Sequence, residues 1–154
     1  MQRHFLYLPF ALQIFGVMAI SMIVPSLYAL VTEQFFEARM FFYTGLLGVT
    51  FLALIGLARS NQTTRETALD QMLSLALIFV FLPVFLAIPE YSVIRTTSFL
   101  NAYLDMVSAL TTTGFEVFPA SRLSDSLHLW RALVGWMGGA LIWVAAVAIL
   151  APLN

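Results

Sequence analysis

The residues with the clearest chemical potential in this sequence are Thr111, Thr112, Thr113 and Gly114, the TTTG run, which stands between two apolar segments. A hydrated cation that enters a narrow pore must exchange its water oxygens for protein oxygens. Main-chain carbonyl groups supply these without placing a full charge in the path. Glycine accepts backbone angles that are closed to other residues, and threonine hydroxyls add further oxygens or tie the chain to its surroundings. The TTTG run is therefore typical of a short segment whose carbonyl oxygens coordinate a cation.

A plainer interpretation of the TTTG run is structural, because a glycine that follows a helix is a common C′ cap. The context favours the cation-coordinating interpretation. Residues 99–110 are predicted to form a helix, with N-cap hydroxyls available at residues 96–98. At about 1.5 Å per residue this helix is roughly 18 Å long, too short to cross a bilayer. A half-length helix before a polar turn that contains glycine is the pattern of a re-entrant loop.

Three charged residues lie near this run. Asp105 falls in the short helix among apolar neighbours, where an unpaired carboxylate would be costly, so we expect a structural partner for it rather than contact with an ion. Arg131 either pairs with Asp105 or Glu116 and holds the loop in place, or extends its side chain to the membrane interface. Glu116 would concentrate cations at the mouth of a pore. Other acids are interpreted as solvated loop charges, namely Glu33, Glu37 and Glu90.

The composition requires lipid as the surrounding medium. Of the 154 residues, 61% are hydrophobic and only 10% are charged, and the mean hydropathy is +0.93. Soluble domains carry about 45–50% apolar and about 25% charged residues. A net charge of -1 gives no indication of nucleic-acid binding, and the absence of cysteine excludes disulfides and thiolate metal sites. No catalytic motif is present, so we predict a protein that is not an enzyme and holds no cofactor.

Four segments are apolar enough and long enough to cross a bilayer, which takes about 20 residues. They are expected at residues 5–31, 40–58, 72–89 and 127–150. Pro25 and Pro83 predict a kink in the first segment and a bend in the third, and the polar residues 59–71 predict a connecting loop. We therefore expect an all-α integral membrane protein with four spanning helices, one re-entrant pore helix and a filter loop. A leading helix pair would occupy residues 1–71, and a helix–pore-loop–helix repeat would occupy residues 72–154.

The last apolar segment is rich in glycine, and Gly135 and Gly139 have the small-xxx-small spacing that lets helices approach closely. Together, the stretches SALTTTGFEVF, LHLWRALVGWMGG and VAILAPLN resemble the first pore repeat of the Trk/Ktr/HKT potassium-transporter superfamily, and TrkH-type subunits in particular. The resemblance covers about residues 72–154. The leading helix pair is similar to the extra pair that precedes the first repeat in TrkH-type subunits.

The resemblance implies a potassium-uptake subunit in which the TTTG run supplies one quarter of a selectivity filter through its carbonyl oxygens, with potassium as the transported ion. It implies that residues 99–110 are the pore helix, that ions pass passively into the cytoplasm, and that a cytosolic nucleotide-binding subunit gates the pore. The expected location is the cell inner membrane (plasma membrane), with both chain ends cytoplasmic. The arginines divide evenly between the two sides, so this orientation rests on the resemblance.

The resemblance implies a transporter in which four such repeats surround one axis, whereas this sequence contains one repeat. A quarter of a ring cannot enclose an ion. We therefore expect the N-terminal part of a longer or split transporter, completed by the remaining pore repeats. The alternatives are a pore assembled from four copies of the chain and a membrane fragment that conducts nothing.

Overall fold

The computed structural model describes residues 10–58 and 68–150, and all regular structure in these two ranges is helical. The helices in chain order are α1 (Phe10–Ser21), α2 (Ile23–Val31), α3 (Phe35–Ala58), α4 (Ala68–Ile94), α5 (Phe99–Leu110) and α6 (Asp125–Leu150), with a 3-10 turn at Ala120–Arg122. In these ranges four apolar helical segments are long enough to cross a membrane, and α1 and α2 together form one of them. The all-α membrane fold predicted from the sequence is confirmed. The re-entrant placement of the shorter α5 stays a prediction.

The first spanning segment is interrupted at Met22, between α1 and α2. Pro25 explains the interruption, because proline has no N–H to donate to the carbonyl group four residues earlier, at Ser21. The hydroxyl of Ser21 donates to the carbonyl oxygen of Met18 at 2.7 Å. The helical pattern resumes where Ser26 N–H donates to the Met22 carbonyl oxygen at 3.2 Å. The helical hydrogen-bond pattern is therefore interrupted just before Pro25, and the kink predicted for this segment stays a prediction.

Three helices extend beyond their predicted bounds. The helix α3 begins at Phe35 rather than at residue 40, α6 begins at Asp125 rather than at residue 127, and α4 extends past both ends of the predicted range 72–89. Pro89 lies inside α4 and is buried, although the sequence places the end of the helix there. The turns on both sides of Pro89 belong to the core, and this packing outweighs the one hydrogen bond that a proline removes. The bend at Pro83 stays a prediction, and the expected start of the first helix lies outside the described residues.

Glycines bring α3 against α1. A Cβ atom at Gly45 would lie 2.9 Å from the carbonyl oxygen of Ala19, and one at Gly48 would lie 2.8 Å from the Ala19 Cβ and 2.5 Å from a ring carbon of Phe85. The backbones of α1 and α3 are therefore in direct contact, and α4 reaches the same place through Phe85. Buried positions follow α3 at helical spacing, namely Ala38, Phe41, Gly45, Gly48 and Leu52.

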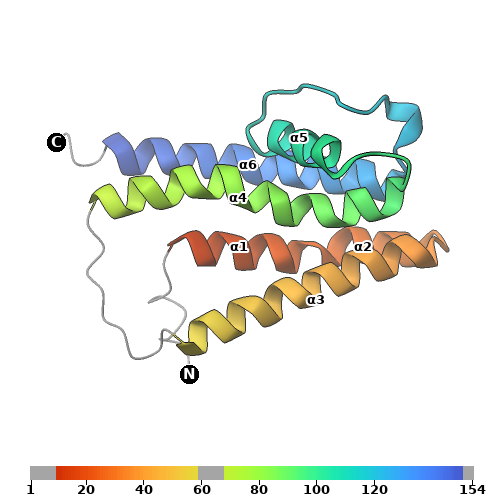
Figure 1. Cartoon of the computed structure of the whole chain (residues 1–154), viewed down its shortest axis with the longest axis horizontal. Coiled ribbons are helices and arrows are strands. Elements are labelled where there is room, and N and C mark those ends of the chain that lie inside the picture. The colour runs from red at the N-terminus through yellow and green to blue at the C-terminus, as the bar shows by residue number, and fades with distance from the viewer. Residues whose placement is uncertain (1–9, 59–67, 151–154) are drawn as a thin grey trace.

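The short helix α5 lies on the outer side of a layer formed by α4 and α6, and α1, α2 and α3 lie on the opposite side of that layer (Figure 1). The hydroxyl of Ser98 caps α5 by accepting the N–H of Asn101 at 3.3 Å, as the hydroxyls at residues 96–98 predicted. One apolar cluster joins α5 to its two neighbours, with Ala102, Met106 and Leu110 from α5, Leu86 from α4 and Trp130 from α6. The start of the loop after α5 is thereby placed against α4 and α6.

Because Gly48 lies where three helices meet, Gly48→Val should destabilise the fold. The added side chain would overlap Ala19 and Phe85, and overpacking of this kind costs about 1–3 kcal/mol. The measurement is the thermal unfolding of the purified chain in mild detergent. Ala53→Val adds comparable bulk on the exposed side of α3 and should leave the unfolding midpoint unchanged. Equal midpoints for the two variants would contradict the close packing of α1 on α3.

Candidate functional site

The helix α5 ends in a Schellman turn formed by the TTTG run. Thr112 N–H donates to the carbonyl oxygen of Ala109 at 3.1 Å, and Thr113 N–H donates to that of Ser108 at 3.0 Å. Thr112 is therefore the C′ residue, and its φ of 54° is left-handed. The interpretation of Gly114 as the C′ cap is wrong, because Gly114 lies two residues farther along the chain.

Two residues of the run have backbone angles that favour glycine. Gly114 has a φ of 76°, and beyond its chain neighbours no atom lies within 4 Å of the place a Cβ would take, so the backbone rather than packing requires glycine here. Thr112 adopts a left-handed φ although it is β-branched, which is rare and costs on the order of 1–2 kcal/mol. Backbone strain of this kind is concentrated at ligand-binding segments and active sites. The geometry of the run is therefore set by its surroundings and not by the preference of its residues.

The main-chain oxygens of the TTTG run are not used inside the described part of the protein. No hydrogen bond between described residues ends on the carbonyl oxygen of Thr111, Thr112, Thr113 or Gly114. The hydroxyls of Thr111 and Thr113, in contrast, do bond internally, since Thr111 Oγ1 lies 2.7 Å from the Val107 carbonyl oxygen and 2.8 Å from Thr113 Oγ1. Carbonyl groups are strong acceptors, so four consecutive free oxygens require water, an ion or another chain as a partner.

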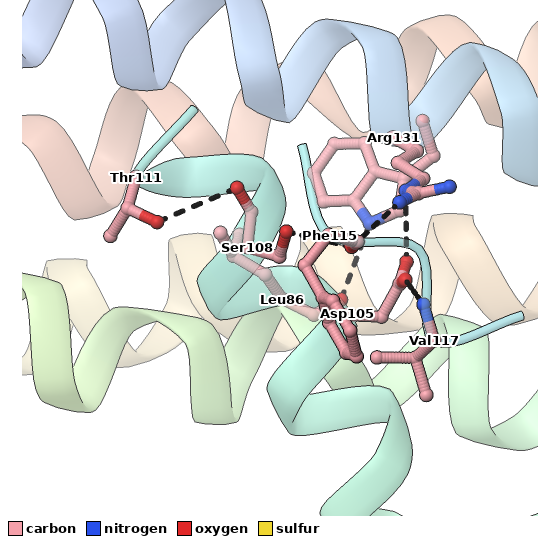
Figure 2. Close-up of polar contacts among 8 residues, drawn as sticks. Leu86, Asp105, Ser108, Thr111, Phe115, Val117 and Arg131 are labelled. Carbon is pink, nitrogen blue, oxygen red and sulfur yellow. Dashed lines mark hydrogen bonds and ion pairs between the residues drawn. The ribbon is translucent and has the colours of Figure 1, made fainter. Parts of the chain in front are cut away.

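The chain is anchored again directly after the TTTG run, as Figure 2 shows. The carbonyl oxygen of Phe115 accepts the hydroxyl of Ser108 at 2.7 Å and Nη2 of Arg131 at 3.2 Å. Two residues later, Val117 N–H donates to Oδ1 of Asp105 at 3.2 Å. The free oxygens therefore lie between two fixed points, the Schellman turn before them and this anchor after them.

A buried ion pair joins α5 to α6 next to this anchor. Nε of Arg131 lies 3.0 Å from Oδ2 of Asp105, and their side chains are 17% and 0% exposed. The contact is electrostatic rather than an aligned hydrogen bond. Arg131 therefore pairs with Asp105 and not with Glu116, which is exposed. With the bond from Val117, both oxygens of the Asp105 carboxylate face a positive or polar group, as a buried charge requires.

Glu90 lies beside this pair, although the sequence predicted no part for it in the site. The side chain of Glu90 is 1% exposed and interacts electrostatically with Asp105 and Arg131. Its interpretation as a solvated loop charge is wrong because α4 continues through Pro89. The signal that could have identified it is the one-turn spacing from Leu86, since a continued helix places both residues on the same buried face.

Glu37 is also not a solvated loop charge. It lies in the first turn of α3, and its carboxylate accepts the hydroxyls of Ser124, at 2.6 Å, and Ser126. A negative charge is favourable at this place because the serines stand at the N-terminus of α6. Glu37 thereby ties the first turn of α3 to the N-terminus of α6, whereas Glu33 is exposed as predicted.

The glycines of α6 line the face that meets the end of α5. A Cβ atom at Gly135 would lie 3.6 Å from the carbonyl oxygen of Ala109, and one at Gly139 would lie 3.8 Å from the methyl carbon of Thr112. Both are ordinary contact distances. The glycine pair with small-xxx-small spacing therefore lies opposite the short helix and the TTTG run.

Removing either partner of the Asp105–Arg131 pair leaves a buried charge without compensation. We expect Asp105→Asn and Arg131→Gln each to lower the free energy of unfolding by about 3–5 kcal/mol, and the double variant to lose less than the sum. The parent, the two single variants and the double variant form a double-mutant cycle, which is measured by unfolding in mild detergent. Asp125→Asn, in the exposed first turn of α6, is the control and should cost far less. Strictly additive losses would show that the pair has no interaction energy of its own.

Curated proteins include two relatives of this chain. Over 73 residues the chain is 41% identical to the Trk system potassium uptake protein TrkI of Halomonas elongata, a match that covers 47% of this chain and 14% of that protein. Over 104 residues it is 31% identical to an uncharacterized cation transporter of Methanocaldococcus jannaschii, a match that covers 66% of this chain and 22% of that protein. The chain thus corresponds to less than a quarter of the length of each of these relatives.

No protein-family model and no solved structure matches the chain. Both relatives are named as cation transport proteins, in agreement with the resemblance carried by the TTTG run and the glycine-rich segment after it. The chain is therefore related to the Trk-type potassium transporters.

Proposed function

We propose that this chain is a potassium-uptake subunit, or the N-terminal part of one, and that the TTTG run supplies one quarter of its selectivity filter. The observation that carries the proposal is the set of four consecutive main-chain oxygens that accept no hydrogen bond from the described residues. Oxygens in this state can replace the water shell of a cation without the loss of any protein hydrogen bond. The Halomonas relative is named for potassium uptake, which favours potassium as the ion.

The charges around the TTTG run support a cation as its ligand. The C-terminus of α5 leads into the run, and this end of a helix carries about half a negative charge. Asp105 is not available as an ion ligand because Arg131 and Val117 N–H occupy its oxygens. Glu116 is exposed just beyond the run and would add negative charge at the pore mouth. The ion would therefore be bound by neutral carbonyl groups with partial and full negative charges nearby.

In this proposal α5 and the TTTG run form a re-entrant pore loop. A helix of 12 residues cannot cross the bilayer, so the loop would enter and leave on one side. Non-helical backbone is tolerated at membrane depth beside a water-filled path. Residues 72–154 would then be one pore repeat and residues 1–71 a leading helix pair, in the cell inner membrane with both ends in the cytoplasm.

One chain supplies one TTTG run, and a ring around an ion needs several. Leu100 and Leu104 on α5 and Phe115 directly after the run expose apolar surface, and these side chains would face further pore repeats or lipid. The relatives extend far beyond the part that matches this chain. This supports further repeats of a longer transporter, rather than other copies of this chain, as the partners that complete the ring. A cytosolic nucleotide-binding subunit is the proposed gating partner, on the family resemblance.

Gly114→Ala should impair the proposed filter without disturbing the fold. The added methyl group meets no nearby atom, but a φ of 76° is unfavourable for alanine, so the backbone of the run must change. In a bacterial strain without its own potassium uptake, the intact transporter that contains this variant should support less growth at low potassium, or lose its preference for potassium over sodium. Gly139→Ala adds the same methyl group on helical backbone and is the matched control. Parent-like growth and selectivity of Gly114→Ala would refute the filter assignment.

Glu116→Gln tests the electrostatic part of the proposal. An exposed charge at a pore mouth attracts cations only within the screening length, which falls from about 30 Å at 0.01 M salt to about 3 Å at 1 M. The potassium concentration for half-maximal uptake should therefore rise roughly twofold at low ionic strength and return to the parent value at high ionic strength. Glu33→Gln, at an exposed acid before α3, is the control. A change that does not depend on salt would contradict a purely electrostatic role.

A further inference from the structure

The end of α5 rests on the backbone of α6 at Gly138. A Cβ atom at this position would overlap the carbonyl oxygen of Leu110, and it would lie 2.7 Å from the carbonyl carbon and 2.9 Å from the Cα of that residue. Gly138 is buried, and Leu110 is 0% exposed. The main chains of the two helices are therefore in contact here with no side chain between them.

The two neighbouring glycines of α6 are not in the same situation. A methyl group at Gly135 or Gly139 would make ordinary contacts, 3.6 Å from Ala109 and 3.8 Å from Thr112. Either position would accept alanine without a movement of α5. Among these three glycines, Gly138 is the one that limits how closely α5 approaches α6.

The position of Leu110 affects the TTTG run directly. Leu110 is the last residue of α5, and its carbonyl group belongs to the peptide that leads into Thr111. On the other side, the run is held by the hydrogen bonds of Phe115 and Val117 to groups on α5 and α6. Close-packed protein interiors transmit strain, so a displacement of Leu110 would be absorbed in the four residues between these points.

We propose that Gly138 is a positioning residue for ion selectivity, because its missing side chain sets the position of the Leu110 carbonyl group and thereby of the four oxygens that follow. The inference rests on the proposed function and concerns the shape of that filter. A methyl group at Gly138 would move the Leu110 peptide by about 1–1.5 Å before ordinary contact distances are restored. Selectivity by carbonyl groups depends on the size of the site or on the number of coordinating dipoles, and both change when the oxygens move.

The test compares Gly138→Ala with Gly135→Ala and Gly139→Ala in the intact transporter that contains this chain. Initial rates of potassium and sodium uptake are measured in a strain without its own potassium uptake, and the amount of transporter in the membrane is quantified. We expect Gly138→Ala to lower the ratio of potassium to sodium uptake roughly tenfold, and the two controls to stay within about twofold of the parent. Gly114→Ala is measured alongside as the reference for the filter itself.

A structural measurement accompanies the transport assay. The chain contains no cysteine, so Thr113→Cys, with any cysteine elsewhere in the transporter replaced, reports how the run reacts with a membrane-impermeant thiol reagent. We expect Gly138→Ala to change the rate of this modification and Gly139→Ala to leave it unchanged. Equal rates in the two backgrounds would contradict a displacement of the run.

Parent-like selectivity of Gly138→Ala beside an impaired Gly114→Ala would overturn the role of Gly138 and leave the proposed function in place. Equal losses of selectivity in all three helix variants would also overturn it. The role of Gly138 would also be overturned if the Gly138→Ala transporter were absent from the membrane, because the contact would then be needed for folding in general. Parent-like uptake by Gly114→Ala would instead refute the proposed function.

Discussion

The buried ion pair between Asp105 and Arg131 is the interaction on which the rest of this region depends. A lone carboxylate in the apolar α5 would be costly, and so would a lone guanidinium on α6, so the two helices must bring these groups together. The same side chains hold the loop after the TTTG run, through Val117 N–H and the Phe115 carbonyl oxygen. One electrostatic requirement thus positions helix against helix and both helices against the loop.

This anchoring explains how four main-chain oxygens in an apolar protein accept no hydrogen bond from any described residue. Backbone groups in lipid normally satisfy one another within a helix. The Schellman turn ends α5 at one side of the TTTG run, and the bonds to Phe115 fix the chain at the other, so the backbone between them does not continue the helix. The left-handed φ of Thr112 is the strain that accompanies this arrangement, on the order of 1–2 kcal/mol. The packing of α5 on α4 and α6 offsets the energetic cost of that strain.

Local signals in the sequence predicted much of the fold and part of the site. Hydropathy located the spanning segments, because a backbone in lipid must satisfy its polar groups within the helix. Both ends of α5 were predicted, since Ser98 offers a cap at one end and the TTTG run ends the apolar pattern at the other. The errors occurred where packing outweighed a local signal. The helix α4 continues through Pro89, and this places Glu90 beside the ion pair instead of in a loop.

By itself, the sequence determined that this chain lies in lipid, that a half-length helix precedes the TTTG run, and that Asp105 needs a structural partner. These conclusions follow from the properties of residues that are close together in the chain. Only the tertiary structure decided that this partner is Arg131, and that Gly138, rather than its glycine neighbours, meets the end of α5. Both outcomes depend on how closely helices distant in sequence approach each other, and the packing of α4, α5 and α6 as a group sets that distance.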